Sequence, residues 1–261
     1  MNDDNALMFT IANIAKRGGL EAMLKLAHAY ASGEGTLSNY GNAFNIYQRI
    51  VDDHAEISAN DPAASHVADA FVALGNYYRT GIPGTGIKAD KRRALALIWH
   101  AASYLGDAEA QCNLAQMLLD GEGIARNGRL AVNWLANAAK KRHAKSQAIL
   151  GGILWRGAPD IRRQPMKGLA LLTLARQNAG SKKEALWIDD LLAGAKEQAN
   201  MAERKGAASL VALWGPHFGG QLDIAASSRN APAYENLTKL APASGKGSLT
   251  KVGLESSPAK R

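Results

Sequence analysis

Residues 114–139 read LAQMLLDGEGIARNGRLAVNWLANAA and contain two apolar segments separated by a short glycine-rich stretch. In the first segment Leu114 and Leu118 are four positions apart, which places both side chains on one face of a helix. Gly121 then supplies the left-handed conformation that commonly ends a helix. The apolar spacing resumes at Trp134. This stretch therefore predicts two helices that fold back on each other as a hairpin.

The same pattern occurs four times along the chain, and its first helix has four fixed features. A leucine is followed directly by Ala or Gly, then by a large side chain four positions after the leucine and by a glycine seven positions after it. One hairpin cannot bury its apolar face alone, whereas stacked hairpins share a continuous core. The repeated leucines and glycines are Leu26, Leu74, Leu114 and Leu150, and Gly33, Gly81, Gly121 and Gly157.

The second helix of each unit is marked by a capping residue and by a small residue four positions later. Asn or Asp before a helix can accept a hydrogen bond from a backbone N–H of the first turn. In the fourth unit Gln replaces this residue, so that unit is the weakest match. The capping and small residues are Asn39, Asp90, Asn127 and Gln164, and Ala43, Ala94, Ala131 and Gly168.

These registers predict both the core and the backbone conformation. We expect the four glycines to have positive φ angles at helix ends, because glycine adopts such angles without strain. We expect no β-sheet beyond a trivial hairpin. The residues predicted to be buried are Leu74, Tyr78, Leu114, Leu118, Trp134, Leu135, Ala138 and Leu150.

The pattern resembles the Sel1-like repeat family, which is related to the tetratricopeptide repeats. Residues 70–84 (AFVALGNYYRTGIPG) and 131–139 (AVNWLANAA) are close to literal matches to its two helices. The resemblance covers about residues 20–180. It implies an all-α fold, a right-handed α-solenoid of stacked helix hairpins.

The expected domain organisation follows from these repeats. We predict a half repeat at 3–19 and repeats at about 20–66, 67–107, 108–143 and 144–180, which together form a solenoid over 1–180. Residues 52–66 are expected to form an exposed loop or a helix extension. Two further helices at 181–218 are predicted to cap the solenoid, and 219–261 reads as a disordered basic tail. The expected inner positions of the cap are Leu186, Trp187, Leu191, Met201, Leu210 and Trp214.

A partner-binding groove is expected along the first helices, on the side chains that the repeat pattern leaves outside the core. These positions come one residue before each repeated leucine and two or three residues after it. The alternative is ordinary solvent exposure. The expected groove residues are Lys25, His28, Asn76, Tyr77, Asn113, Gln116, Met117 and Ile153.

The formal charge of +8 is concentrated in the middle of the chain. Residues 124–183 contain 13 Lys and Arg against a single acidic residue, Asp160. We predict one positive surface here that meets an acidic partner, with a solvated face as the alternative. Nucleic acid is not expected, because aromatic side chains do not alternate with the basic ones. The basic-surface residues are Lys140, Lys141, Arg142, Lys145, Arg162 and Arg163.

The sequence offers no convergent set of catalytic groups, so we expect no enzyme, no cofactor and no metal. The six histidines are scattered, without the close pairing of ligands that a metal site needs. Cys112 is the only cysteine and is expected to be a small buried side chain; a single cysteine forbids an intramolecular disulfide. No apolar stretch approaches the roughly 20 residues of a membrane-spanning helix.

A narrower resemblance is to the ExoR group of regulators within the Sel1-like family. It rests on AFNIYQRIVDD (43–53), VALGNYYRTGIPGTGIKAD (72–90) and AEAQCNLAQMLLDGEG (108–123). It implies a periplasmic protein that represses exopolysaccharide synthesis by holding a membrane sensor histidine kinase inactive. The first 20 residues lack the pattern of a signal peptide, so this placement requires a longer precursor.

Two other functions remain open at this point. The first is a generic Sel1-like adaptor in the cytoplasm or in a host cell. The second is an enzyme of cell-wall or polysaccharide metabolism, which a cluster of carboxylates in one pocket would favour. Whether the gene encodes a signal peptide upstream of Met1 would separate the first from the leading hypothesis.

Overall fold

A computed structural model describes residues 13, 19–33 and 39–217. These residues form ten helices, and the only β-structure among them is an isolated bridge between Ala158 and Ile161. The all-α prediction is confirmed. The helices are α2 (Leu20–Ser32), α3 (Tyr40–His54), α4 (Ala64–Thr80), α5 (Lys91–Ser103), α6 (Ala108–Asp120), α7 (Gly128–Lys140), α8 (Ala144–Arg156), α9 (Pro165–Asn178), α10 (Lys182–Gln198) and α11 (Met201–His217).

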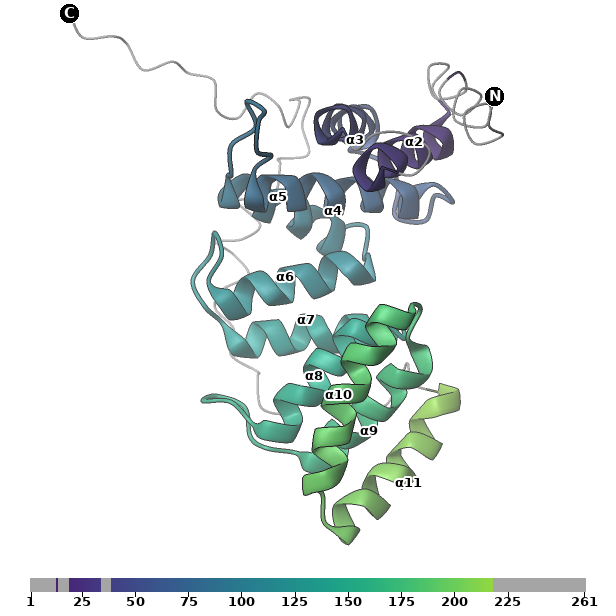
Figure 1. Ribbon diagram of the computed structural model, residues 1–261, viewed down its shortest axis with the longest axis vertical. Helices are drawn as coiled ribbons and strands as arrows, with labels where there is room; N and C mark the ends of the chain where they lie inside the picture. Colours follow the sequence, from purple (N-terminus) through teal and green to yellow (C-terminus); the bar gives the residue numbers. More distant parts are fainter. Residues whose placement is uncertain (1–12, 14–18, 34–38, 218–261) are drawn as a thin grey trace, which may run out of the picture. The chain divides into compact units, whose positions relative to one another are not determined.

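The chain divides into two compact units, with the division between His100 and Ala101 near the end of α5. The first unit contains the hairpins α2–α3 and α4–α5 (Figure 1). The second contains the hairpins α6–α7 and α8–α9, followed by α10 and α11, which both pack on α9. Residues 55–63 form turns between α3 and α4, as expected for this part of the chain.

The first helices end as the repeat pattern predicts. Gly33, Gly81, Gly121 and Gly157 all have positive φ angles, between 71° and 80°. Each glycine donates its N–H to the carbonyl four residues earlier, so the helix is closed at that point. A side chain at Gly81 would also meet the backbone nitrogen of Ala89 at 2.9 Å, so the loop leaves no room for one.

The second helices begin as predicted, with one exception. Asn39, Asp90 and Asn127 accept hydrogen bonds from the backbone N–H three residues later, at 2.9, 3.0 and 3.0 Å. Gln164 makes no such bond. In its place Pro165 starts α9, where a missing N–H has no cost because the first-turn donors are unpaired anyway.

Small residues bring the two helices of a hairpin into close contact. A Cβ atom on Gly168 would lie 2.6 Å from the backbone nitrogen of Trp155 and 2.8 Å from the carbonyl oxygen of Gly151. The backbones of α8 and α9 therefore touch at this point. In the first unit, a Cβ atom on Gly75 would meet the Ile98 side chain at 2.7 Å.

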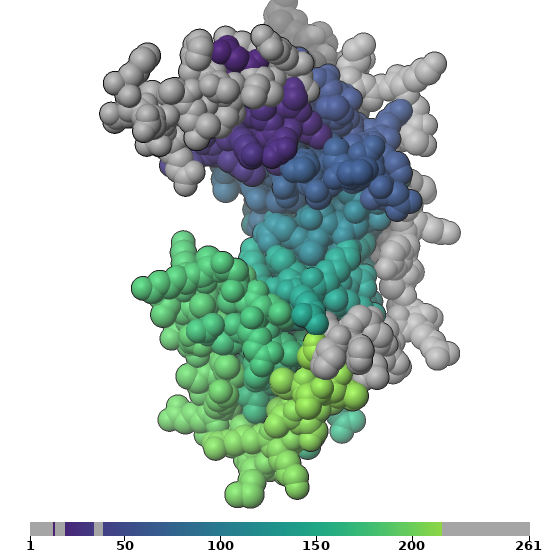
Figure 2. Space-filling model, turned by 90° about the vertical axis from the view of Figure 1, so that its right-hand side faces the viewer, coloured from purple at the N-terminus to yellow at the C-terminus, as the bar shows by residue number. Residues whose placement is uncertain are grey.

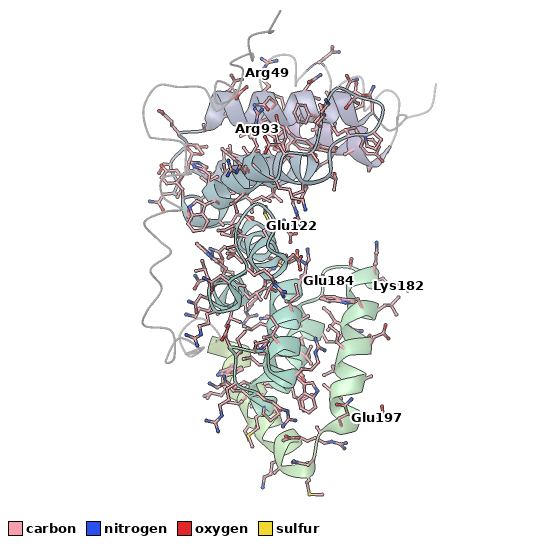
Figure 3. All side chains as sticks on the ribbon, turned by 90° about the vertical axis from the view of Figure 1, so that its left-hand side faces the viewer. Arg49, Arg93, Glu122, Lys182, Glu184 and Glu197 are labelled. Carbon is pink, nitrogen blue, oxygen red and sulfur yellow. The ribbon has the colours of Figure 1, made fainter. Side chains whose placement is uncertain are left out.

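The predicted core is confirmed, since all eight residues are buried. Leu74 and Tyr78 lie in the first unit, and the other six lie in the second. Tyr78 is further covered by the guanidinium of Arg93, which lies 4.4 Å from its ring centroid (Figure 3). Cys112 is fully buried, as expected.

Two buried glutamines of the second unit bind carbonyls that come shortly before them in the same unit. Gln111 and Gln147 each stand three residues before a repeated leucine, and each donates a hydrogen bond of 3.1 Å to a carbonyl near the end of the preceding hairpin. The acceptors are the carbonyls of Ala102 and Ala139. Gln147 in turn accepts a bond of 2.9 Å from Asn178 of α9. One repeat earlier, Arg142 stands where Asn178 stands relative to Gln147. Its hydrogen bond goes to the Gly215 carbonyl and not to Gln111.

The inner face of the C-terminal cap differs from the prediction. Leu186, Trp187 and Met201 are exposed, with 58%, 40% and 85% of their surface accessible. Leu191 and Leu210 are partly exposed. Only Trp214 of the six expected residues is buried. The buried set instead consists mainly of the residues next to or between the expected ones, namely Ile188, Leu192, Ala195, Ala199 and Ala207.

Other predictions fall on residues that the structure does not describe. The half repeat at 3–19 lies almost entirely outside the described residues, and the basic tail at 219–261 lies entirely outside them. The division of the chain into repeats, cap and tail remains a prediction.

Candidate protein-binding surfaces

In the first unit, the expected groove residues are accessible. Lys25 and His28 on α2 and Asn76 on α4 are exposed, and Tyr77 is half-buried. Lys25 forms an ion pair of 2.7 Å with Glu21 one turn earlier, so part of its charge is compensated on its own helix.

Tyr77 is the centre of an aromatic cluster that the repeat pattern does not predict. Its ring centroid lies 6.4 Å from that of Tyr40, 6.2 Å from Phe44 and 6.1 Å from Tyr47. Edge-on and tilted packing of this kind is favourable for aromatic rings. Burial raises the pKa of Tyr77 above its ordinary value.

Tyr40 extends this cluster to the surface, because 48% of Tyr40 is exposed. It is the first residue of α3, directly after the N-cap Asn39. Large exposed aromatic side chains on a rigid element are common at protein interfaces. The signal for Tyr40 is its position four residues before Phe44, which places both rings on one face of α3.

In the second unit, half of the expected groove is wrong. Asn113 and Met117 are buried, at 3% and 0% exposure, whereas Gln116 and Ile153 are partly accessible. The reason is the position of α6 in the array. α6 packs on α7 and is linked through Gln111 to the end of α5, so residues on most sides of it are covered. The exposed strip on this helix is narrower than the leucine register alone predicts.

Three of the expected basic-surface residues lie in the α7–α8 turn and bind within the protein. Lys141 donates a hydrogen bond to the Gly106 carbonyl, and Arg142 donates one of 2.7 Å to the Gly215 carbonyl on α11. Lys145 pairs with Glu109 at 3.3 Å. Burial lowers the pKa of Lys141, and the nearby Asp107 opposes this shift. Lys140 is partly exposed, without a hydrogen bond or ion pair to another described residue.

An ionic cluster joins α6 to the start of α8, and sequence reasoning missed it. His143 Nε2 lies 2.9 Å from Glu109 Oε2, and His143 Nδ1 lies 2.8 Å from Ser146 Oγ. The hydrogen bond from His143 is the main cause that lowers the pKa of Glu109 to about 2. Burial by itself lowers the pKa of His143, but its contacts with Cys112 and Glu109 outweigh this and raise the pKa to about 9. His143 is therefore a cation at neutral pH and holds two helices together.

The two remaining basic residues lie in the α8–α9 loop and behave differently from each other. Arg163 donates from Nε to the Trp155 carbonyl at 3.0 Å and from Nη2 to Glu203 on α11 at 3.2 Å. Its guanidinium carbon lies 5.0 Å from the Trp155 ring centroid. Arg162 is exposed and has no hydrogen bond or ion pair with another described residue.

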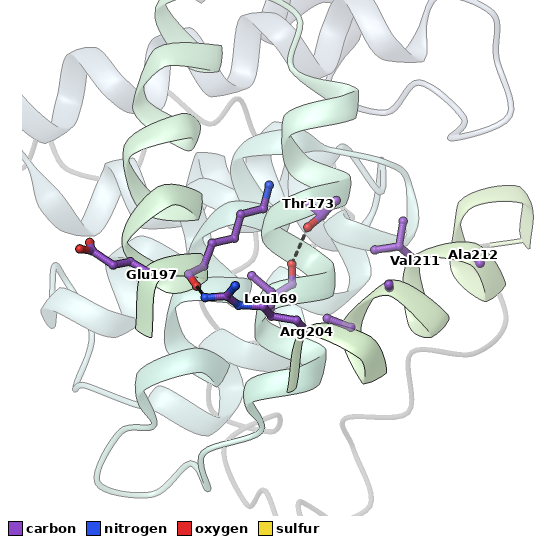
Figure 4. A pocket seen from close by; sticks show the side chains of 9 residues that line it. Leu169, Thr173, Glu197, Arg204, Val211 and Ala212 are labelled. Carbon is purple, nitrogen blue, oxygen red and sulfur yellow. Dashed lines mark hydrogen bonds between the residues drawn. The ribbon is translucent and has the colours of Figure 1, made fainter. Parts of the chain in front are cut away.

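A cleft of about 660 Å³ opens where α10 and α11 both pack on α9 (Figure 4). Figure 2 shows the surface of these two helices in green and yellow-green. Arg204 closes one end of the cleft, donating to the carbonyls of Ala199 and Lys196 at 2.9 and 2.7 Å, which caps the end of α10. The Glu197 side chain points away from this guanidinium (Figure 4). The walls are otherwise mostly small and apolar: Leu169, Thr173, Ala207, Ala208, Val211 and Ala212.

The four repeated hairpins correspond to a known sequence repeat. Residues 20–52, 68–104, 108–143 and 144–178 match the Sel1 repeat. The chain belongs to the Sel1 repeat family. A solved Sel1 repeat protein from Oxalobacter formigenes has the same fold, with a TM-score of 0.59 and 21% sequence identity over 81% of this chain and 80% of that one.

Two curated relatives of this Sel1 repeat chain are described as negative regulators of exopolysaccharide production. They come from Rhizobium meliloti (strain 1021) and Rhizobium leguminosarum bv. viciae and are 34% and 35% identical to this chain. Each match extends over 196 residues, which is 75% of this chain and 70% of the relative. The chain is thus related to these regulators over most of its length.

The surfaces can now be placed on the Sel1 repeats. The expected groove and basic residues all lie within the matched repeats, whereas most of the cleft is formed by residues from Lys196 onward, beyond the last match. Within the described part of the chain, no three His, Cys, Asp or Glu residues are grouped as a metal site would need. None of the described helices combines the length and the apolar character needed to cross a membrane.

Proposed function

We propose that this Sel1 repeat protein is a non-enzymatic negative regulator of exopolysaccharide production. The observation that carries the proposal is the relationship to two such regulators over 196 residues. Stacked helix hairpins offer an extended surface for a protein partner, which supports action by binding and not by catalysis.

We further propose that the partner is the periplasmic domain of a membrane sensor histidine kinase, which the bound protein holds inactive. This step rests on the resemblance to the ExoR group. The proposed site of action is therefore the periplasm. Within the first unit, Tyr40, Tyr77, Asn76 and His28 are the contacts we assign to this partner. Within the second unit we assign Gln116 and Ile153.

Complementation tests the proposal directly. A Rhizobium meliloti strain that lacks its own regulator would receive this chain behind a periplasmic export signal. We expect exopolysaccharide production to return to the wild-type level. A stable, exported protein that leaves production unchanged would contradict the regulatory function. Export-dependent repression would exclude the cytoplasmic adaptor.

A matched pair of variants tests the groove. Tyr40→Ser removes an aromatic ring at 48% exposure, and Tyr104→Ser removes one at 49% exposure outside the assigned surface. We expect only Tyr40→Ser to lose repression, because an exposed aromatic anchor contributes to binding. Equal repression by both variants would remove the first-unit groove from the proposal.

The kinase step needs its own measurement. Autophosphorylation of the sensor kinase would be followed in membrane vesicles, with and without purified protein on the periplasmic side. We expect the protein to suppress autophosphorylation. If the protein represses exopolysaccharide production in cells but has no effect on the kinase, the kinase is not its partner. The proposal that the protein is a negative regulator would still stand.

A further inference from the structure

The second unit carries its cations on two different edges. One edge is the α7–α8 turn, where Lys141, Arg142 and Lys145 are bound to carbonyls or to Glu109, as described above. The other edge is formed by the α6–α7 and α8–α9 loops. These two loops adjoin, since a Cβ atom on Gly128 would lie 3.8 Å from Ile161 Cδ1.

Some cations of the loop edge have a structural role. Arg126 donates from Nε to the Leu119 carbonyl at 2.7 Å, and Arg163 does the same to the Trp155 carbonyl in the next repeat. Both acceptors stand two residues before the glycine that ends the helix. These two arginines therefore close the ends of α6 and α8, and their positions are explained by the fold.

Three further arginines on this edge are not explained in the same way. Arg129, Arg156 and Arg162 are exposed, and their side chains have no hydrogen bond or ion pair among the described residues. We call these three residues the arginine edge. Arg156 benefits from its place in the last turn of α8. Arg129 and Arg162 have no comparable benefit.

Arg129 lies where a cation opposes helix stability. It is in the first turn of α7, at the positive end of the helix dipole, and neither α7 nor α9 has an acidic residue in its first turn. By contrast, α6 begins at the other end of the α6–α7 hairpin and has Glu109 in its first turn. The arginine edge and the N-terminal ends of α7 and α9 thus add to one positive field, which Asp120 and Glu122 reduce on the side of the α6–α7 loop.

We propose that the arginine edge is the docking surface for an acidic segment of the protein partner; this inference rests on the proposed function. Guanidinium groups bind carboxylates through paired hydrogen bonds, which suits Asp and Glu side chains. Asp160 is exposed in the same loop and would repel a uniformly anionic polymer. A protein surface of mixed charge can place a basic residue opposite Asp160 and acidic ones opposite the arginines.

The test uses a triple charge reversal, Arg129→Glu with Arg156→Glu and Arg162→Glu, in the complemented Rhizobium meliloti strain. The control is Lys182→Glu with Lys183→Glu and Lys205→Glu, three exposed lysines without hydrogen bonds or ion pairs among the described residues. Lys182 lies at the start of α10 (Figure 3). Both variants change the net charge equally. We expect loss of repression only for the arginine variant. Thermal unfolding should show both variants folded, because the stabilising change at Arg129 offsets the destabilising change at Arg156.

Binding to defined probes separates the possible outcomes. We expect a labelled peptide of glutamates with one lysine at its centre to associate about tenfold more slowly with the arginine variant than with the control, the lower end of electrostatic steering effects. The corresponding Arg→Gln variant should lie between them. If the wild-type chain does not repress, the proposed function fails. If it represses and the arginine variant represses equally, this inference alone fails. Tighter binding of polygalacturonate, a uniformly anionic polymer, than of this mixed-charge peptide would also overturn it.

Discussion

The α8–α9 hairpin and the α10–α11 pair show two ways of joining helices in the same unit. In α8–α9 the backbones touch through Gly151 and Gly168, and apolar side chains are buried from both helices. Between α10 and α11 the connection is polar, made by Arg204 and the ends of the helices, and a cleft remains over α9.

This difference in packing indicates which helices contribute most to the free energy of unfolding. A repeated hairpin is packed by its own partner helix and by the neighbouring hairpins. The terminal helices rest on α9 and expose much of their apolar surface, including Leu186 and Met201. Nearest-neighbour packing predicts that a repeat array is least stable at its ends. Mutations should therefore cost much more in the hairpins than in α10 and α11.

The largest effect is expected for Leu114→Ala in α6. Leu114 is fully buried in the second unit, so truncation removes apolar contacts and leaves a cavity. We expect the free energy of unfolding to fall by about 2–5 kcal/mol. The matched variant Leu186→Ala, in the exposed part of α10, should change it by less than about 0.5 kcal/mol. Urea denaturation of both variants would measure the difference, and equal values would contradict the comparison.

A second test uses two glycines. Gly168→Ala places a Cβ atom against backbone atoms of α8, which cannot move away as a side chain can. We expect a loss of about 1–3 kcal/mol. Gly194→Ala in α10 meets no atom within 4 Å and should stabilise the protein by about 0.5–1 kcal/mol, the usual difference between Gly and Ala in a helix. A destabilising Gly194→Ala would mean that α10 is packed as tightly as α9.

His143→Gln tests the ionic link between α6 and α8, and its effect should depend on pH. The folded-state pKa of His143 is about 9, above its unfolded value of 6.5, so its contribution is complete below pH 6.5 and disappears as the pH rises through 9. The pKa of Glu109 is about 2, below its unfolded value of 4.5, so its contribution is complete above pH 4.5 and is lost as the pH falls through 2.

The two dependences together define the measurement. We expect His143→Gln to cost about 1 kcal/mol near pH 5.5–6, a low value for a charged hydrogen bond because Glu109 is 41% exposed. The cost should be smaller at pH 9.5. Denaturation across this pH range would show it, and a cost that grows with pH would reverse the assigned protonation state.

The smallest effect is expected at the α7–α8 turn. Arg142→Ala removes the hydrogen bond to the Gly215 carbonyl, which joins this turn to α11. We expect a loss of about 0.5–1 kcal/mol, seen as faster hydrogen exchange in α11. Lys140→Ala, two residues earlier in the sequence but without such a bond, should leave α11 unchanged. Equal exchange in both variants would show that α11 is held by α9 alone.

Repetition explains which parts of the fold could be predicted from sequence. Leu114 was placed correctly because three other leucines in register support the same inward face. Leu186 and Met201 were placed wrongly because α10 and α11 occur once, so nothing in the sequence fixed which face they bury. Asn113 and Met117 failed for a related reason. The repeat identifies the residues of a helix that face the centre of the core. It does not show how many of the residues on either side of them are buried by neighbouring helices.

The candidate site was predictable only where side chains act alone. Tyr77 and Asn76 follow from the leucine register. The pairing of Glu109 with His143 spans 34 positions and depends on how two hairpins meet, so no local pattern reveals it. For the same reason the sequence could not distinguish Arg142, which binds a carbonyl on α11, from Arg162, whose side chain has no bond to another described residue.

The glutamine contacts have a consequence for the order in which the chain folds. Gln111 and Gln147 each bind a carbonyl that was synthesised eight or nine residues earlier, near the end of the helix just completed. During translation the acceptor therefore leaves the ribosome before its donor. The first helix of each new hairpin can therefore bind a carbonyl that already exists, so that folding keeps pace with synthesis from the N-terminus, and the Gln147 oxygen is paired later, when Asn178 has been made.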